Sequence, residues 1–352
     1  MTLRSLLSIL LASCVSASAF AQASIDRATL SASGPLSDAQ KSAVTAFISR
    51  NGASFKPGTD AKAMDDARWA MVSTLRDPAA SPMFRKAFAV AAVSELGPLV
   101  KGTDVQGAVQ AMQVLRFTRA TEAIDMLVER STPSSEPSAS KRVSASTLLV
   151  EGLKDVDANA AYFESASRRL REAAVAETDP IALQQKFFAI ASAARRKDLP
   201  PDNARVVRRA LVESMSGVAK SIRTAKSADA RMQAMQRALI SVRNDILEMS
   251  QAERSEVAKV LAPALSDLIA AAGAQWDSAH GGALAASYAA TMNSCEVLLR
   301  LLDRGMRPSA YEGAKPDSEQ RVLQPAWDDK DRAKFDAEAK KWASIVGAAP
   351  YR

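Results

Sequence analysis

Residues 231–250 read RMQAMQRALISVRNDILEMS, and this stretch decides the fold class. Apolar side chains at Met235, Leu239, Val242, Ile246 and Met249 follow one another at steps of four, three, four and three residues, the spacing of a helical seam. The same stepping recurs in both neighbouring segments, at Val207, Leu211, Ser214 and Val218 and at Val257, Leu261, Ala264 and Leu268. Because consecutive long helices with short connections pack antiparallel, we expect a bundle-like region over residues 202–304.

Helix signals extend over the rest of the chain. The sequence has 70 alanines among its 352 residues, and alanine is the strongest helix former. Ser37 with Gln40 and Ser250 with Glu253 fit capping boxes. A capping side chain precedes a proline at Asp77-Pro78, Ser81-Pro82 and Asp179-Pro180. No run alternates β-branched and aromatic residues between turn residues, so we expect an all-α protein. The expected helices cover about residues 36–50, 60–76, 81–100, 103–117, 119–131, 142–175, 180–197, 202–225, 228–249, 251–273, 283–304 and 328–346.

The segment from Asp77 to Arg130 carries small and apolar residues on three successive expected helices. These are Arg85, Ala87, Ala91 and Leu96 on the first, Asp104, Val105, Ala108, Ala111, Val114 and Leu115 on the second, and Ile124 and Leu127 on the third. The segment resembles HEAT-type helical repeats, although Gln106 and Gly107 stand where the family usually has an arginine. The resemblance implies an α-solenoid, in which each helix pair completes its core by stacking on its neighbours and the array presents an extended binding surface.

The first 23 residues have the features of a secretory signal. A positive start at Met1–Arg4 precedes an apolar stretch at Ser5–Val15, which is too short to span a bilayer. Small residues follow, and we expect cleavage after Ala21 or Ala23, which would leave a periplasmic or secreted protein. Alternatively, the residues 11–14 (LASC) are similar to a lipobox, which would make Cys14 the lipidated start of an outer-membrane lipoprotein.

Breaks in the helical pattern divide the mature chain into four parts. Residues 24–130 are the expected N-terminal helical-repeat region, and residues 131–140 (STPSSEPSAS) are a Ser/Pro linker or a loop ordered only in place. Residues 141–305 are the region of long helices. Residues 306–352 are an irregular stretch followed by a helix. We expect Trp327 and Trp342 to pack this helix against the rest of the protein.

Positive charge is concentrated in the middle of the chain. The formal net charge is +7, and residues 141–243 contain 19 Lys and Arg but 11 Asp and Glu. Arg205, Arg208 and Arg209 share one helix face, and Arg168 and Arg171 lie close together on another helix. These five arginines are candidates for binding an anionic partner such as lipid headgroups, lipopolysaccharide or a cell-wall polymer. The alternative is a solvated face with acidic neighbours, and the scarcity of aromatic residues argues against nucleic acid.

Catalytic and metal-binding motifs are missing from the sequence. It has no Gly-rich phosphate loop, no paired-histidine zinc motif, no Cys-x-x-Cys and no nucleophile elbow, so we expect no cofactor and no metal. The single histidine, His280, is expected to be an exposed residue in a loop over residues 273–282. Cys295 falls among leucines at helical spacing, which predicts that it is a buried, unreactive residue.

The sequence therefore favours an exported, non-enzymatic helical-repeat protein that binds a protein partner or scaffolds an assembly in the cell envelope. One alternative is a peripheral envelope protein that binds anionic lipid or polymer through the basic helical face. Another is an all-α enzyme whose site is assembled from residues far apart in the chain.

Overall fold

The computed structural model describes residues 24–312 and 321–351, so the expected leader and Cys14 lie outside the described residues. The described chain contains helices and no strand. The α-helices are α1 (Arg27–Leu30), α2 (Asp38–Gly52), α3 (Ala61–Arg76), α4 (Pro82–Lys101), α5 (Val105–Phe117), α6 (Thr121–Arg130), α7 (Ala139–Asp155), α8 (Ala160–Val175), α9 (Pro180–Ala194), α10 (Pro201–Thr224), α11 (Arg231–Glu248), α12 (Gln251–Ala274), α13 (Trp276–His280), α14 (Ala285–Met306), α15 (Leu323–Asp328) and α16 (Arg332–Val346). Two short 3-10 helices are η1 (Ala53–Phe55) and η2 (Pro308–Tyr311).

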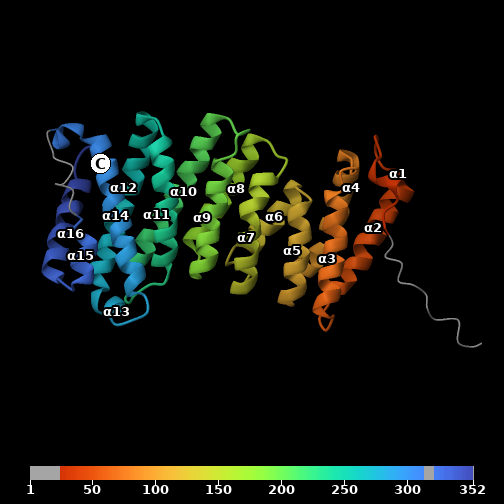
Figure 1. Cartoon of the computed structure of the whole chain (residues 1–352), viewed down its shortest axis with the longest axis horizontal. Coiled ribbons are helices and arrows are strands. Elements are labelled where there is room, and N and C mark those ends of the chain that lie inside the picture. The colour runs from red at the N-terminus through yellow and green to blue at the C-terminus, as the bar shows by residue number, and fades with distance from the viewer. Residues whose placement is uncertain (1–23, 313–320, 352) are drawn as a thin grey trace, which may run out of the picture.

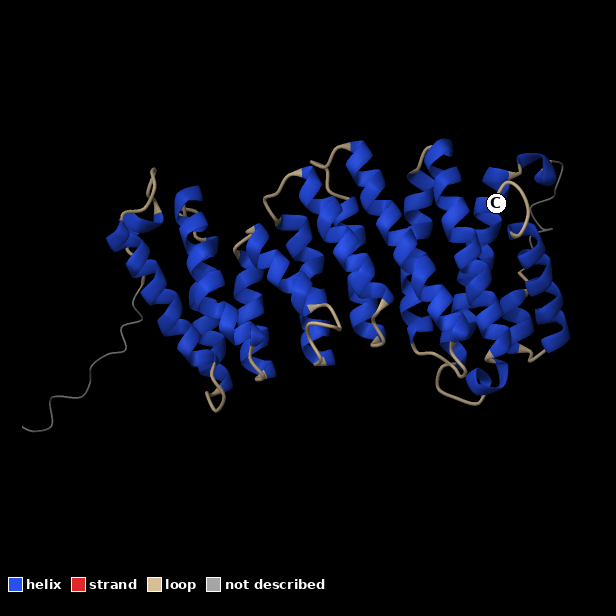
Figure 2. Cartoon of the chain, turned by 180° about the vertical axis from the view of Figure 1, so that it is seen from behind, coloured by secondary structure: helices blue, strands red, loops and turns tan. Residues whose placement is uncertain are grey.

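The helices lie side by side across the long axis of the molecule (Figure 1). Their contacts define two layers: layer A contains α3, α5, α7, α9, α11 and α14, and layer B contains α2, α4, α6, α8, α10 and α12. Each helix contacts the next member of its own layer, and contacts such as α4 with α5 and α8 with α9 join the layers. One hydrophobic core extends between the layers from Leu36 to Tyr351. The same row of helices is visible from behind in Figure 2.

The predicted all-α class is confirmed, and its local signals act as expected at several points. The seam residues Met235, Leu239 and Ile246 on α11 are fully buried, and α11 packs against α9 and α14. The capping box at Ser37 is complete: the Gln40 N–H donates to the Ser37 hydroxyl, and the Ser37 N–H donates to the Gln40 side chain. These local features place helix ends where the sequence signals them.

Two helix boundaries expected from the sequence are wrong. The expected single helix over residues 142–175 is two helices, α7 and α8. Asn159 caps the start of α8, because its side chain accepts a hydrogen bond from the Tyr162 N–H at 3.0 Å. Asp77-Pro78 does not begin a helix. Asp77 instead follows the end of α3, and its side chain closes a turn by accepting from the Ala79 N–H at 2.7 Å. The next helix, α4, begins at Pro82, after the predicted cap at Ser81.

Helix α5 passes very close to η1 at Gly107. A Cβ atom at Gly107 would lie 1.9 Å from the carbonyl oxygen of Phe55. No L side chain can occupy that position without moving the backbone of η1 or α5. The close approach explains why a glycine stands at this point of α5.

The Ser/Pro segment is an ordered connection between α6 and α7, in which Ser131 and Glu136 are buried. Helix α7 begins at Ala139 and packs against both α5 and α6. The single last helix expected to carry both Trp327 and Trp342 is two helices: Trp327 lies on α15 and Trp342 on α16, and both side chains are buried. Among the described helices, α12 has the length and composition to cross a membrane, but 67% of its most apolar window is buried in the protein.

Candidate functional site

Three of the five arginines that are candidates for binding an anionic partner form short ion pairs in layer B, those of Arg171 and Arg208 between helices and that of Arg209 within α10. Arg171 on α8 and Arg209 on α10 both contact the carboxylate of Glu213, at 2.5 and 2.8 Å. Burial acts to raise the pKa of Glu213, but the hydrogen bonds from Arg209 and Arg171 outweigh it and hold the pKa below its usual value. Arg208 contacts the carboxylate of Glu253 on α12 at 2.5 Å. These charges are therefore used to join α8, α10 and α12.

The other two arginines of this group, Arg205 and Arg168, are exposed, as Arg209 is. Arg205 lies 3.3 Å from the carboxylate of Asp202, one turn earlier on the same helix. Arg168 is exposed and forms no ion pair within the described chain. The structure thus brings four of the five arginines against an acidic partner and leaves Arg168 facing solvent.

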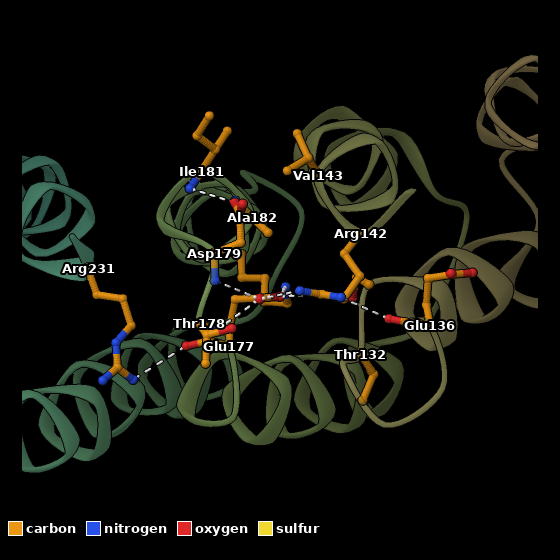
Figure 3. Close-up of polar contacts among 12 residues, drawn as sticks. Thr132, Glu136, Arg142, Val143, Glu177, Thr178, Asp179, Ile181, Ala182 and Arg231 are labelled. Carbon is orange, nitrogen blue, oxygen red and sulfur yellow. Dashed lines mark hydrogen bonds and ion pairs between the residues drawn. The ribbon is translucent and has the colours of Figure 1, made fainter. Parts of the chain in front are cut away.

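A buried network of charges surrounds Glu177, in the turn between α8 and α9 (Figure 3). The Glu177 side chain is 0% exposed, and its carboxylate accepts hydrogen bonds from Arg142 at 2.9 and 3.0 Å and from Lys186 at 2.7 Å. The backbone N–H groups of Thr178 and Asp179 also donate to it, at 3.0 and 2.9 Å. Burial acts to raise the pKa of Glu177, but these hydrogen bonds outweigh it and lower the pKa to about 2. Burial lowers the pKa of Lys186, because the loss of hydration outweighs the hydrogen bond and the attraction to Glu177.

The network continues to the two preceding turns on the same edge. The guanidinium of Arg142 donates to the carbonyl oxygens of Glu136 and Pro137, at 3.0 and 2.9 Å. The adjacent Lys141 lies 2.6 Å from the carboxylate of Glu136 and donates to the carbonyl oxygen of Gly102 at 2.8 Å. The first turn of α7 therefore connects the α4–α5, α6–α7 and α8–α9 turns.

Similar contacts connect the later turns of this edge. Arg231, at the start of α11, pairs with Asp229 at 2.7 Å and donates to the carbonyl oxygen of Glu177 at 3.5 Å. The Asp229 N–H donates to the hydroxyl of Tyr288 on α14 at 2.8 Å, and the Gln275 amide donates to two carbonyl oxygens at the end of α10. We call this set the polar ladder; its members are Lys141, Arg142, Glu177, Lys186, Arg231, Gln275 and Tyr288. It lies on the lower edge of Figure 1, the edge that carries α13.

A groove of about 820 Å³ opens on the opposite edge, above the turn between α5 and α6. It exists because α6 has only 10 residues, whereas its layer neighbours α4 and α8 have 20 and 16. Figures 1 and 2 show the α5–α6 pair ending below its neighbours along this edge. We call the groove the α6 notch. Its walls are the N-terminal half of α4 and the turn between α7 and α8.

Apolar side chains line the α4 wall of the α6 notch and lie open to solvent. Val90 is 68% exposed and Met83 is 39% exposed, and Val93 follows on the same face. Phe84 and Phe88, on the opposite face of α4, are fully buried in the core. Helix α4 is therefore apolar on two faces, of which the fold covers one.

The charged residues of the α6 notch are of both signs: Arg85 and Lys86 lie on α4, Arg119 and Glu122 in the floor, and Asp155, Asp157 and Arg196 on the far side. Lys86 is exposed on the α4 wall, and Glu122 and Asp157 are exposed on the floor and on the far wall. Arg119, in the floor, has a left-handed backbone with φ of 58° and accepts a hydrogen bond from the Asp157 N–H at 3.1 Å. That hydrogen bond holds the floor against the far wall.

Sequence reasoning missed the α6 notch, although two signals for it are present. Met83, Lys86, Val90 and Val93 form a second stripe at helical spacing, on the face opposite Phe84 and Phe88. In addition, the expected helix over residues 119–131 is much shorter than the one over residues 81–100. A two-faced helix beside a short one indicates an uncovered apolar face.

His280 differs from its prediction as an exposed loop residue. It ends α13, is partly buried, and its ring stacks on Trp327 at a centroid distance of 4.0 Å. The two ring nitrogens lie 3.0 Å from the carbonyl oxygens of Trp276 and Trp327. A neutral imidazole can donate to only one of these oxygens, whereas the imidazolium donates to both. His280 thus connects α13 to α15.

Cys295 is buried, as predicted, and burial raises the pKa of its thiol. In the part of the chain that the structure describes, no group of three or more His, Cys, Asp or Glu side chains is placed to hold a metal ion. No family model, curated protein or solved structure matches this chain. The fold and the geometry define an all-α protein with two packed helical layers, a buried polar ladder on one edge and, on the other, a notch that has one apolar wall.

Proposed function

We propose that the mature chain is an exported α-solenoid of the HEAT-like class that binds a protein partner, or scaffolds an assembly, in the cell envelope. The observation that carries the proposal is the packing order. From α4 to α12, each helix contacts the neighbouring helix of its own layer, and most pairs of sequence neighbours also contact each other across the layers. Such quasi-one-dimensional stacking is typical of helical-repeat proteins, whose extended surfaces bind other proteins.

The polar ladder gives a second line of support. Polar side chains at the starts of α7 and α11 reach back to the preceding turns on one edge, and side chains on α14 and at the end of α12 do the same. A contact that recurs at successive turns is expected when successive helix pairs are equivalent units. Export is proposed from the leader-like residues 1–23.

We favour a protein partner over an anionic lipid or polymer because of the charge pairing on layer B. Arg171, Arg208 and Arg209 already have carboxylate partners at 2.8 Å or less. An anionic ligand would have to displace those carboxylates, whereas an apolar contact at Val90 or Met83 displaces only water.

Cross-linked affinity purification of the mature protein from envelope fractions tests this function. The comparison bait carries Arg168→Glu and Arg205→Glu, which reverse the two arginines of the basic face that do not contact Glu213 or Glu253 and leave those pairs intact. We expect both baits to recover the same protein, which then binds the purified chain with little dependence on salt. The proposal would be overturned if the parent bait recovered only lipid or polymer and the charge-reversed bait did not recover it.

A further inference from the structure

We propose that His280 is a pH-sensitive clasp, which holds α15 and α16 on the body of the protein more firmly when its imidazole ring is protonated. The inference goes beyond the proposed binding function, because it concerns how firmly the C-terminal end of the array is closed. It is carried by the atoms that face the two ring nitrogens, by the rings stacked on the imidazole and by the place of the clasp in the fold.

Each ring nitrogen of His280 faces an oxygen that can only accept a hydrogen bond. Nδ1 lies 3.0 Å from the carbonyl oxygen of Trp276 on α13, and Nε2 lies 3.0 Å from the carbonyl oxygen of Trp327 on α15. A neutral imidazole has one N–H group, so its other nitrogen would present a lone pair to a carbonyl oxygen. The imidazolium has two N–H groups and donates to both helices at once.

The rings around His280 also favour the charged form. The imidazole stacks on Trp327 at a centroid distance of 4.0 Å, and the ring of Trp276 lies 4.4 Å away. The face of an indole ring attracts a cation. The half-buried position of His280 acts against its charge, whereas the two carbonyl oxygens and the indole rings act for it.

The charged side chains on the surrounding elements do not pair with the ring. They are Asp277 on α13, Asp328 on α15, Asp329, Lys330 and Asp331 in the turn that follows, and Arg332 and Asp336 on α16. Within the described residues none of them forms an ion pair with His280. Arg332 pairs with Asp336 at 3.5 Å. Residues 268–274 at the end of α12 carry no charge, and α14 contributes the hydroxyl of Tyr288, which belongs to the polar ladder.

The clasp lies where the last two helices close the end of the core. Helix α15 packs on α14, and α16 packs on α12 and α15. Figure 1 shows this pair at the end of the row of helices, and its side chains Trp327, Phe335 and Trp342 are buried. A helix pair at the end of an array can open without displacing the other helices. A weaker clasp therefore lets α15 and α16 open more often and uncovers apolar surface of α12 and α14.

The direction of the pH dependence follows from the proton. In the closed form the imidazolium has two carbonyl acceptors, and in the open form it has only water. A histidine in an unfolded chain changes charge near about pH 6.5. The stability that the proton adds is therefore present below that pH and is lost as the pH rises above it. His280 is the only histidine in the sequence, so this range of pH isolates its effect.

Two measurements on the mature full chain test the clasp. Nitrogen-15 labelling of histidine alone gives the ring signals of one residue, and we expect both ring nitrogens to carry a proton at about pH 5.5 and one of them at about pH 8. Hydrogen exchange is then measured at both pH values and expressed as protection factors, which removes the intrinsic pH dependence of exchange. Protection of α15 and α16 should be at least about fivefold higher at the lower pH, while that of α4 to α8 stays unchanged.

His280→Gln is the diagnostic variant, because a glutamine side chain has the same donor and acceptor groups at both pH values. It should abolish the pH dependence of α15 and α16 and leave α4 to α8 protected as in the parent, whereas a misfolded variant would lose protection throughout. Asp277→Asn and Asp328→Asn are the matched controls, since they remove exposed carboxylates beside the clasp. Each should keep the pH dependence of the parent.

Three results would overturn the inference. They are a ring that stays neutral at about pH 5.5, protection of α15 and α16 that is equal at the two pH values, and a pH dependence that persists in His280→Gln. None of these measurements uses a partner, so their outcome is independent of that of the proposed binding function.

Discussion

The ammonium group of Lys186 and the carboxylate of Glu177 lie 2.7 Å apart, and both side chains are 0% exposed. Removing two charges from water is costly, and their attraction repays that cost only when the remaining hydrogen-bonding groups are also satisfied. Arg142 and the N–H groups of Thr178 and Asp179 complete the bonds of this carboxylate. The pair is therefore a point at which a small chemical change should have a large effect on stability.

Glu177→Gln should lower the free energy of unfolding by about 3–5 kcal/mol, because Lys186 and Arg142 would remain buried without their counter-charge. Urea unfolding followed by circular dichroism measures this change. Glu172→Gln is the control, since the Glu172 side chain is 66% exposed and surface substitutions usually change stability little. Equal losses in the two variants would show that the buried carboxylate is not needed for stability.

Acid should weaken the fold through the same carboxylate. The pKa of Glu177 is lowered from 4.5 to about 2, so its contribution is present above pH 4.5 and is lost as the pH falls toward 2. This shift corresponds to about 3 kcal/mol. The stability difference between the parent and Glu177→Gln should therefore shrink as urea unfolding is repeated at decreasing pH below 4.5. A difference independent of pH in this window would contradict the assignment.

Gly107→Ala should destabilise the protein, because the added Cβ would lie 1.9 Å from the carbonyl oxygen of Phe55. Relief of such a clash requires backbone movement, and overpacking costs about 1–3 kcal/mol or more. Gly34→Ala is the matched control, since no atom lies within 4 Å of a Cβ added there. Thermal unfolding of both variants checks the prediction, and a normal melting temperature for Gly107→Ala would refute it.

His280→Ala should loosen the contact between α13 and α15. It removes the ring stacked on Trp327 and the contacts to two carbonyl oxygens, which together stabilise by about 1–3 kcal/mol. Hydrogen exchange should become faster over residues 323–346, while the exchange of α4 to α8 stays unchanged. The exposed neighbour Asp277 provides the control variant Asp277→Ala. Unchanged protection of α15 and α16 would show that other contacts hold them.

The fold class could be predicted from the sequence because it depends on short-range periodicity. The seam from Met235 to Ile246 and the cap at Ser81 are local features, and both behave as their spacing indicates. The break before Asn159 was missed because one capping residue is a weak signal inside a strongly helical run.

The features that depend on distant residues could not be predicted in the same way. Arg142 and Lys186 count as positive charge in the sequence, but both are buried against Glu177. Glu177 is 35 residues from Arg142. His280 meets Trp327 across 47 residues. The α6 notch depends on how far α4, α6 and α8 each extend toward the same edge of the molecule. The lengths of the helices suggest this arrangement but do not determine it.

The burial of Cys295 has a practical consequence for labelling. It is the only cysteine in the described part of the chain, and its thiol is inaccessible to solvent. A fluorophore or spin label could therefore be attached to a cysteine substituted for Val90 without first removing a native thiol from this region. Such a label would report directly whether the α6 notch is empty or filled.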